Sequence, residues 1–168
     1  MKIIVFSDSH GNYKALSRAL ELNAAGISMC VFLGDGVDDI ECALEAYPTL
    51  PRVIVAGNRE DYYSVFTGSG DYPKECLFDA GGIKFLALHG HRPSNVKGGL
   101  GATAAYAASK GADVVLYGHT HIADDRTVEG GGRQIRMINP GSAGRGSEPS
   151  FALLNISDGF LICGFGKL

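Results

Sequence analysis

Five short apolar segments, each followed at once by a polar loop, constrain the fold of this 168-residue chain more than any other feature. The segments are residues 3–6, 30–33, 53–55, 85–88 and 114–117. They consist largely of β-branched, aliphatic and aromatic residues and are bounded by Gly, Asp or Asn, a pattern typical of strands buried on both faces. The sequence therefore predicts a sheet with buried central strands.

Helical patterns separate several of these segments. Asn12 is placed to cap a helix that ends near Gly26, and Asp38 or Asp39 is placed to open a second helix that runs up to the next proline. A third, alanine-rich helix is expected over about residues 101–110. Strands that alternate with helices in this way predict an α/β domain.

The C-terminal third reads as strands joined by short turns rather than as alternating strands and helices. Strands are expected at residues 133–138, 151–156 and 160–165, the last two joined by a hairpin loop at residues 157–159. Another hairpin is expected from residues 75–79 and 83–88. The sheet is therefore mixed or there are two sheets, and we favour a second sheet packed on the first.

Length, charge and cysteine usage restrict the class of protein. A chain of this length is expected to form a single domain, residues 1–168. A net charge of −3 argues against a nucleic-acid binder that works by general phosphate neutralisation. No apolar segment approaches the roughly 20 residues that span a bilayer, and residues 1–8 do not resemble a signal peptide. The four cysteines are widely spaced, so we expect reduced packing residues and a cytoplasmic location.

The polar loops after the five segments carry all the histidines of the chain. The side chains in question are Asp8, His10, Asp35, Asn58, His89, His91, His119 and His121. Each motif is weak by itself, since Gly-Asp and Gly-Asn pairs are common in turns and a lone histidine is usually only a hydrogen-bonding group. Ligands of α/β proteins bind beyond the carboxyl ends of the strands, so five such loops together predict one site.

Carboxylate, imidazole and amide groups without a thiolate suit Mn, Fe, Zn, Co or Ni rather than a Cys-rich structural zinc site. Two Asp, one Asn and four of the five His make a set of seven ligands, which is too many for one ion that keeps an open position. They suit two ions about 3.5–4 Å apart that share a bridging carboxylate. Asp35 is the candidate for that bridge.

The ordered motifs Asp8-x-His10, Gly34-Asp35, Gly57-Asn58, His89 and Gly118-His119-x-His121 resemble those of the calcineurin-like metallophosphoesterase superfamily. The short chain is similar to the small bacterial and archaeal phosphodiesterase branch, which shares its fold with a eukaryotic retromer subunit. The resemblance extends to residues 89–92, 111–115 and 139–142 and covers essentially the whole chain. It implies a four-layer α/β/β/α sandwich of two mixed β-sheets flanked by helices.

The same resemblance implies a ligand set for each of two divalent metal ions. Asp8, His10 and His121 would hold the first ion, Asn58, His89 and His119 the second, and Asp35 would bridge them. Manganese is the metal most expected, with Ni, Mg, Zn, Fe or Co as alternatives. Asp35, Asn58, His89, Arg59 and His91 are then the candidate catalytic residues, and Asn139-Pro140-Gly141-Ser142 is expected to shape the floor of the site.

The activity implied is hydrolysis of a small phosphodiester by a hydroxide that bridges the two ions, with charge on the phosphoryl oxygens neutralised by the metals. A phosphomonoesterase of the same fold and a catalytically weak interaction scaffold are the alternatives. Another binuclear enzyme, such as an amidohydrolase, would show a different order of ligands. Self-association is left open by the sequence.

Three residues near the motifs have more than one interpretation. Arg59 stands where many members of the superfamily carry a histidine proposed to assist the leaving group, and it either clamps a phosphate oxygen or lies at the surface. A guanidinium does not release its proton, so substrates with good leaving groups are expected to be preferred. His91 either supports a ligand, contacts phosphate or is solvated. Arg145 either reaches the substrate or is solvated.

Overall fold

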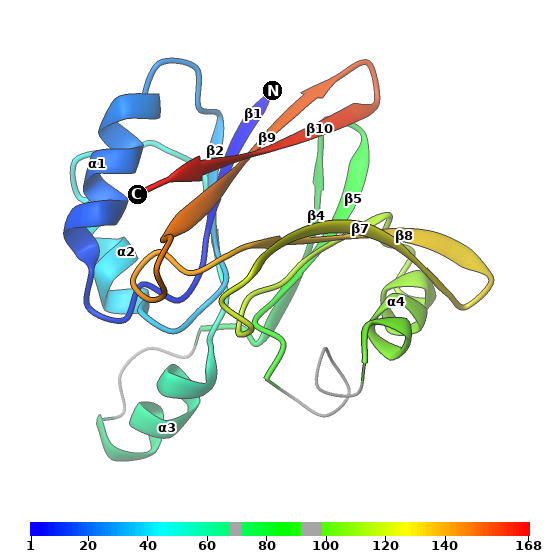
Figure 1. The fold of residues 1–168 in the computed structure, drawn as a ribbon, viewed down its shortest axis with the longest axis horizontal. Helices are drawn as coiled ribbons and strands as arrows, with labels where there is room; N and C mark the ends of the chain where they lie inside the picture. Colours follow the sequence, from blue (N-terminus) through cyan, green and yellow to red (C-terminus); the bar gives the residue numbers. More distant parts are fainter. Residues whose placement is uncertain (68–71, 92–98) are drawn as a thin grey trace.

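The computed structural model describes residues 1–67, 72–91 and 99–168, with the side chains of residues 63–67 outside that description. Arg92, which belongs to one of the sequence motifs, also lies outside it. Figure 1 shows two sheets between α1 and α2 on one side and α4 on the other. The predicted four-layer α/β/β/α architecture of two mixed sheets is confirmed.

The first sheet has the strand order β10-β9-β1-β2-β3. Its strands are β1 (Lys2–Phe6), β2 (Met29–Phe32), β3 (Arg52–Ile54), β9 (Ser150–Ser157) and β10 (Phe160–Lys167). Strands β1, β2 and β3 are parallel, whereas β9 runs antiparallel to both β1 and β10. The hairpin predicted at residues 157–159 is thus confirmed as the connection between β9 and β10.

The second sheet has the strand order β4-β5-β6-β8-β7. Its strands are β4 (Glu75–Ala80), β5 (Ile83–Leu88), β6 (Val114–Leu116), β7 (Ala123–Gly130) and β8 (Arg133–Pro140). The three central strands are parallel and the two edge strands pair antiparallel with their neighbours. In each sheet the parallel strands therefore have their carboxyl ends on the same side, and the polar loops begin there.

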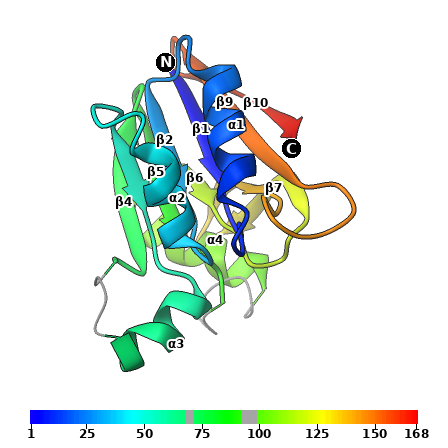
Figure 2. The ribbon, with the colours of Figure 1, turned by 90° about the vertical axis from the view of Figure 1, so that its left-hand side faces the viewer.

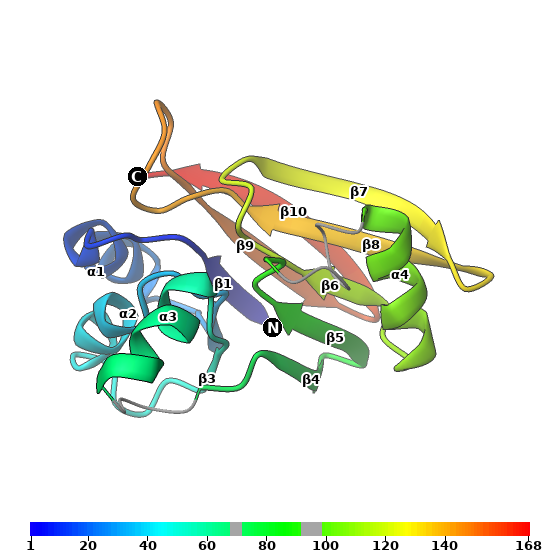
Figure 3. The same ribbon diagram turned by 90° about the horizontal axis from the view of Figure 1, so that it is seen from below.

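Helices α1 (Tyr13–Asn23) and α2 (Val37–Leu44) cover the outer face of the first sheet, as Figure 2 shows. Their apolar faces pack on β1 and β2 through residues such as Leu20 and Ile40, both of which are buried. Helix α4 (Leu100–Ser109) covers the outer face of the second sheet (Figure 3). The amphipathic pattern of each helix is thus satisfied by one sheet face.

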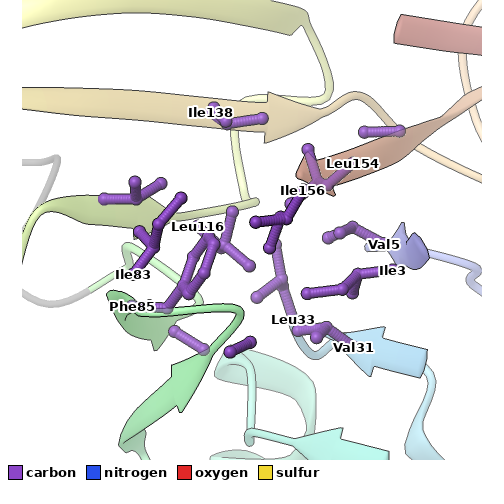
Figure 4. Packing of buried hydrophobic residues seen from close by; sticks show 14 of the residues in the cluster. Ile3, Val5, Val31, Leu33, Ile83, Phe85, Leu116, Ile138, Leu154 and Ile156 are labelled. Carbon is purple, nitrogen blue, oxygen red and sulfur yellow. The ribbon is translucent and has the colours of Figure 1, made fainter. Parts of the chain in front are cut away.

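The main core lies between the two sheets. Figure 4 shows Ile3 and Val5 of β1 across from Phe85 and Leu116 of the second sheet, with Leu33 between them. All five side chains are fully buried. Burial of such apolar side chains on both faces explains why the central strands read as continuous apolar segments.

Several sequence expectations need correction. Helix α2 begins at Val37, and Asp38 and Asp39 lie in its first turn rather than capping it. The residue before this helix is Gly36, with a φ of 142°, a conformation that needs glycine. Cys42 is exposed and is not a packing residue, although all four cysteines are unpaired as expected.

Two elements were not anticipated. Helix α3 (Asn58–Thr67) begins at a candidate ligand, and strand β7 forms a hairpin with β8 through the Gly131-Gly132 turn. Most of the β7 side chains are polar and exposed, so this edge strand carries no apolar periodicity. Within the described part of the chain, no helix is long and apolar enough to cross a membrane.

Candidate metal centre

The candidate ligands lie on backbone that is held in an uncommon conformation. Among the described residues other than glycine, six have a positive φ, and five of these six are predicted ligands. They are Asp8, His10, Asp35, His119 and His121, with φ between 49° and 68°. Such conformations cost energy for residues with a Cβ and concentrate at functional sites. The strand ends are therefore built to turn these side chains inward.

The first predicted ligand group is brought together by the structure. Donor atoms of Asp8, His10 and His121 all lie within 4.8 Å of one another. The Oδ1 atom of Asp8 is 3.1 Å from Nε2 of His121, which in turn is 3.2 Å from Nε2 of His10. Asp8 is completely buried, so its carboxylate must find compensation from these partners or from a cation.

The second group joins residues from both sheets. Donor atoms of Asp8, Asp35 and His89 lie within 4.8 Å of one another, with Asp35 Oδ1 3.6 Å from His89 Nε2. Asn58 connects the remaining predicted ligand to this group, since its Oδ1 lies 3.2 Å from His89 Nε2 and 3.1 Å from His119 Nδ1. Asp8 thus belongs to both groups, and all seven predicted ligands meet in one cluster.

The two ring nitrogens of His89 have different partners, and only Nε2 faces the other candidate ligands. Its Nδ1 lies 2.6 Å from the carbonyl oxygen of Leu33, and a carbonyl only accepts a hydrogen bond. The proton is therefore on Nδ1, and in the neutral ring Nε2 presents a lone pair to Asp35 and Asn58. Two buried carboxylates beside such a nitrogen form a donor set that fits divalent cations.

Burial and nearby positive charge also favour neutral imidazoles in this cluster. Burial lowers the pKa of His10, and the charge of Arg145 lowers it further, against the opposite effect of the Asp8 and Asp35 carboxylates. Burial likewise lowers the pKa of His119, with a further contribution from His89. Both effects keep a ring nitrogen free of a proton near neutral pH.

Glu60, which the sequence reasoning missed, fastens two ligand loops together. Its carboxylate accepts hydrogen bonds from the backbone N–H groups of Asp35, Gly36, Val37 and Gly57, at 2.7–3.1 Å. Burial alone would raise the pKa of Glu60, but these four hydrogen bonds hold it below its usual value. The acidic residue in the first turn of α3 was the available signal.

Residues 139–142, expected as a turn, are the end of strand β8 (Asn139 and Pro140) and the two residues that follow it, and they contact the ligand loops. The buried amide of Asn139 donates to the carbonyl oxygen of Gly118 and to Thr120, each at 3.0 Å. The hydroxyl of Ser142 donates to the backbone carbonyl of Asp8 at 2.8 Å. This segment therefore connects the ligand loop that follows β1 to the one that follows β6.

Gly118 is required by the close approach of two ligand loops. A Cβ at this position would collide with the side-chain oxygen of Ser7 and would come within 2.9 Å of Asp8 Oδ2. The same carboxylate oxygen of Asp8 accepts a hydrogen bond from the backbone N–H of His119 at 3.0 Å. The glycine thus lets the His119 loop contact Asp8 directly.

Arg59 lies at the cluster and not at the surface. Its backbone N–H donates to Asp35 Oδ1 at 2.9 Å, and its guanidinium lies 3.2 Å from Nδ1 of His10. Because a guanidinium only donates, this contact places the His10 proton on Nε2. A cation on that Nε2 would therefore require the proton to move to Nδ1, and the contact with Arg59 would then be lost.

His91 and Arg145 lie at the edge of the cluster. The ring of His91 is centred 5.3 Å from that of His89, and its Nε2 lies 3.0 Å from an oxygen of Asp61. With its side chain 15 % exposed, His91 is not a solvated loop residue. Arg145 has an exposed side chain, and its backbone N–H donates to Ser142 at 2.9 Å.

Buried Asp8, Asp35 and His89, joined by three partly buried histidines at the strand ends of two packed sheets, form a donor set that suits divalent cations. Comparison with known proteins agrees, since the family model of the calcineurin-like phosphoesterase superfamily domain matches residues 1–159. The chain therefore belongs to the calcineurin-like phosphoesterase superfamily, whose members depend on metals.

Individual proteins of this family resemble the chain in sequence and in structure. The chain is 33% identical over 143 residues to a probable metallophosphoesterase, YsnB of Bacillus subtilis, covering 84% of this chain and 75% of that protein. A predicted phosphoesterase of Streptococcus pneumoniae has a similar structure, with a TM-score of 0.76 and 25% identity over 99% of this chain and 88% of that one.

Two further solved structures share the fold. The zinc complex of Vps29 from Entamoeba histolytica has a TM-score of 0.69 and 25% identity, over 99% of each chain. A structure described as a novel archaeal phosphodiesterase has a TM-score of 0.64 and 23% identity, over 98% of this chain and 99% of that one. The second likeness concerns the fold alone.

Proposed function

We propose that this chain is a phosphodiesterase that works with two divalent metal ions, and that residues 1–168 form one metallophosphoesterase domain. The observation that carries this proposal is the convergence of all seven predicted ligands, from both sheets, on a single cluster around the buried Asp8, Asp35 and His89. Asp8, His10 and His121 would hold one ion, Asn58, His89 and His119 the other, and Asp35 would lie between them. Manganese is the metal we expect.

The cations, when bound, would supply Lewis acidity, which acidifies water and neutralises charge on phosphoryl oxygens. The protein residues provide positioning. Glu60 and the segment of residues 139–142 fix the ligand loops before substrate arrives, so little reorganisation is needed during the reaction. The guanidinium of Arg59, beside His10, would hold a phosphate oxygen of the substrate.

Substrates with good leaving groups are preferred because no proton donor of the histidine type follows Asn58. Arg59 keeps its proton, so departure of the alcohol depends on the intrinsic stability of the leaving group. The choice of a diester over a monoester follows the resemblance to the small phosphodiesterase branch, and the likeness in fold to an archaeal phosphodiesterase agrees with it. The reduced state of the four cysteines supports a cytoplasmic location, and self-association is compatible with the exposed edge strand β10.

The test is hydrolysis of bis(p-nitrophenyl) phosphate and of p-nitrophenyl phosphate by protein stripped of metal and reloaded with Mn, Ni, Mg or Zn. We expect metal-dependent turnover of the diester in preference to the monoester. Preference for the monoester would assign the alternative activity, phosphomonoesterase. Asp35→Ala and His119→Ala should each abolish turnover while circular dichroism shows the fold retained. Retained activity in Asp35→Ala would overturn its bridging role.

An interaction scaffold is the second candidate, and one observation favours it. Phe160 and Ile162 on the edge strand β10 are 76% and 67% exposed, which is unusual for large apolar side chains on one strand. No turnover with any metal, in protein shown to hold ions, would favour the scaffold over the enzyme.

A further inference from the structure

Strand β10 differs from the other three strands that lie at the edges of the two sheets. Strand β3 has only three residues, and β4 and β7 carry charged side chains such as Asp79 and Asp125. Strand β10, drawn in red in Figure 1, has eight residues, and Lys167 is its only charged one. Short or charged edge strands resist the addition of a further strand. Within the described part of the chain no strand pairs with the outer edge of β10, so this edge is open.

The backbone of β10 presents hydrogen-bonding groups at that outer edge. Ile156 of β9 faces Leu161 of β10, and Ile156 exchanges two backbone hydrogen bonds with Met1 of the neighbouring chain segment, each 2.8 Å long. Hydrogen-bonded and non-hydrogen-bonded pairs alternate in an antiparallel ladder, so Leu161 and every second residue after it direct N–H and C=O outward. The Leu161 carbonyl oxygen accepts from Arg136 at 2.6 Å, and its second lone pair can still accept from another strand.

The side chains of β10 divide between two faces. Leu161 packs against the core between the sheets, so Phe160, Ile162, Gly164 and Gly166 share the opposite face. Phe160 and Ile162 are 76% and 67% exposed, whereas a Cβ added at Gly164 would meet nothing within 4 Å. One face therefore presents two large apolar side chains followed by two positions without a side chain.

We propose that β10 pairs antiparallel with β10 of a second copy of this chain, about a two-fold axis at Cys163. In this register Ile162 lies opposite Gly164 of the second copy, and Phe160 lies opposite Gly166. Each large apolar side chain then covers a glycine across the strand pair, an arrangement that stabilises antiparallel sheets. The interface uses the same strand of both copies, as two-fold symmetry requires, and it joins two five-stranded sheets into one.

Charge favours this register over its neighbour. Lys167 would lie opposite Gly159 of the second copy and beside Asp158, whose carboxylate contacts only the Ser157 hydroxyl among the hydrogen bonds of the described residues. Opposite charges therefore meet at both ends of the paired strands. A register centred on Gly164 would place that glycine opposite its own copy and would leave the space above both without a side chain.

This inference does not depend on the proposed function. Strand β10 runs parallel to β1, so its carboxyl end lies on the side of the sheet where the ligand loops begin. Antiparallel pairing of two copies therefore places their metal clusters at opposite ends of the joined sheet. The second copy would also cover Phe160 and Ile162, the exposed side chains that favour an interaction scaffold.

Sedimentation equilibrium of the full chain tests the interface. We expect the wild type to have twice the 17.7 kDa mass of one chain. Ile162→Lys should raise the dissociation constant of the dimer at least about a hundredfold, because one ammonium group from each copy would lose water. Leu22→Lys, at a 71% exposed position on α1, is the matched control and should leave the dimer intact. Both variants should bind Mn²⁺ like the wild type.

Disulfide crosslinking tests the register, in a chain whose Cys42 and Cys163 are replaced by alanine. In the proposed register positions 162 and 164 form a non-hydrogen-bonded pair with Cα atoms about 4.5 Å apart, which a disulfide can bridge. Mild oxidation should therefore link the Ile162→Cys protein to the Gly164→Cys protein in a mixture. Neither protein should crosslink by itself, and a mixture of Ile162→Cys with Leu22→Cys should not crosslink.

A wild type that sediments as a single chain, or a dimer that Ile162→Lys does not weaken, would overturn the interface. Crosslinking of the Ile162→Cys protein with itself, and not with the Gly164→Cys protein, would overturn the register. Hydrolysis of bis(p-nitrophenyl) phosphate decides the proposed function separately, since either result there leaves the mass of the particle unchanged.

Discussion

Under the proposed function, arginine at position 59 would govern which esters are cleaved, because a guanidinium keeps its proton and this one lies 3.2 Å from the candidate ligand His10. A residue that holds a phosphate oxygen but cannot protonate the leaving alcohol makes the rate depend strongly on leaving-group acidity. Because that dependence would come from one side chain, a substitution of Arg59 can test it.

Replacement Arg59→His should weaken the dependence. Across a series of aryl methyl phosphates with leaving phenols of increasing pKa, we expect the wild-type rate to fall steeply. The variant should fall less steeply, because an imidazole can donate a proton. Arg59→Lys, which keeps the charge, is the control and should retain the steep slope. Identical slopes for the wild type and Arg59→His would contradict the clamp assignment.

Glu60 is a second residue with a large expected contribution to stability, since its one carboxylate accepts hydrogen bonds from four backbone N–H groups of two ligand loops. Glu60→Gln should lower the free energy of unfolding by about 1–3 kcal/mol, because charge-assisted hydrogen bonds become neutral and one amide hydrogen opposes the backbone donors. Urea denaturation measures the loss, with Glu45→Gln, an exposed change, as the matched control.

The pH dependence of that difference has a defined sign. Because folding lowers the pKa of Glu60, its contribution is fully present above the unfolded-state pKa of about 4.3 and is lost as pH falls through the lower folded pKa. The stability gap between wild type and Glu60→Gln should therefore be constant near neutrality and close in acid. A gap that widened below pH 4 would show that the carboxylate is not stabilised by these hydrogen bonds.

At the scale of elements, the central strands and three of the helices follow from local pattern. The apolar segments at residues 3–6 and 85–88 lie within β1 and β5, and the alanine-rich segment lies within α4. These elements are predictable because burial on both faces, or on one face of a helix, leaves a periodic trace in the sequence. The meeting of the candidate ligands was predictable for the same reason, since each follows a recognisable strand.

Helix α3 and strand β7 were not predictable in this way. Helix α3 begins at Asn58 with a polar first turn, and what fixes its start is the contact of Glu60 with a distant loop. Strand β7 is an exposed edge strand. Most of its side chains are polar, so the sequence lacks the alternation of apolar and polar residues that marks a strand. Tertiary contacts override local propensity in both elements.

The geometry of the ligand loops also depends on the close approach of the loop after β6 to the loop after β1. A substitution at the point of contact can test this geometry. Gly118→Ala should disturb the contact of the β6 loop with Ser7 and Asp8, where an added Cβ has no room. We expect metal affinity to fall at least about tenfold, an effect typical of displaced supporting contacts. Gly101→Ala, where a Cβ meets open space, is the control and should bind metal normally. Calorimetric titration with Mn²⁺ decides between them.

At the scale of the whole molecule, the site joins the two sheets. Asp8 and Asp35 follow strands of the first sheet, whereas His89, His119 and His121 follow strands of the second. Cations that bind only this assembled cluster should stabilise the entire fold, by about 2.7 kcal/mol when the free ion is at 100 times its dissociation constant. Denaturation with and without a chelator measures this, and no difference would indicate that ions do not bind across the sheets.

The most direct test of a binuclear site relates metal content to activity. Stripped protein is titrated with Mn²⁺ while bound metal per chain and hydrolysis of bis(p-nitrophenyl) phosphate are followed in the same samples. We predict two ions per chain in the wild type, with turnover that rises only as the second ion binds. Full activity with one ion bound, or no activity with two, would contradict the account.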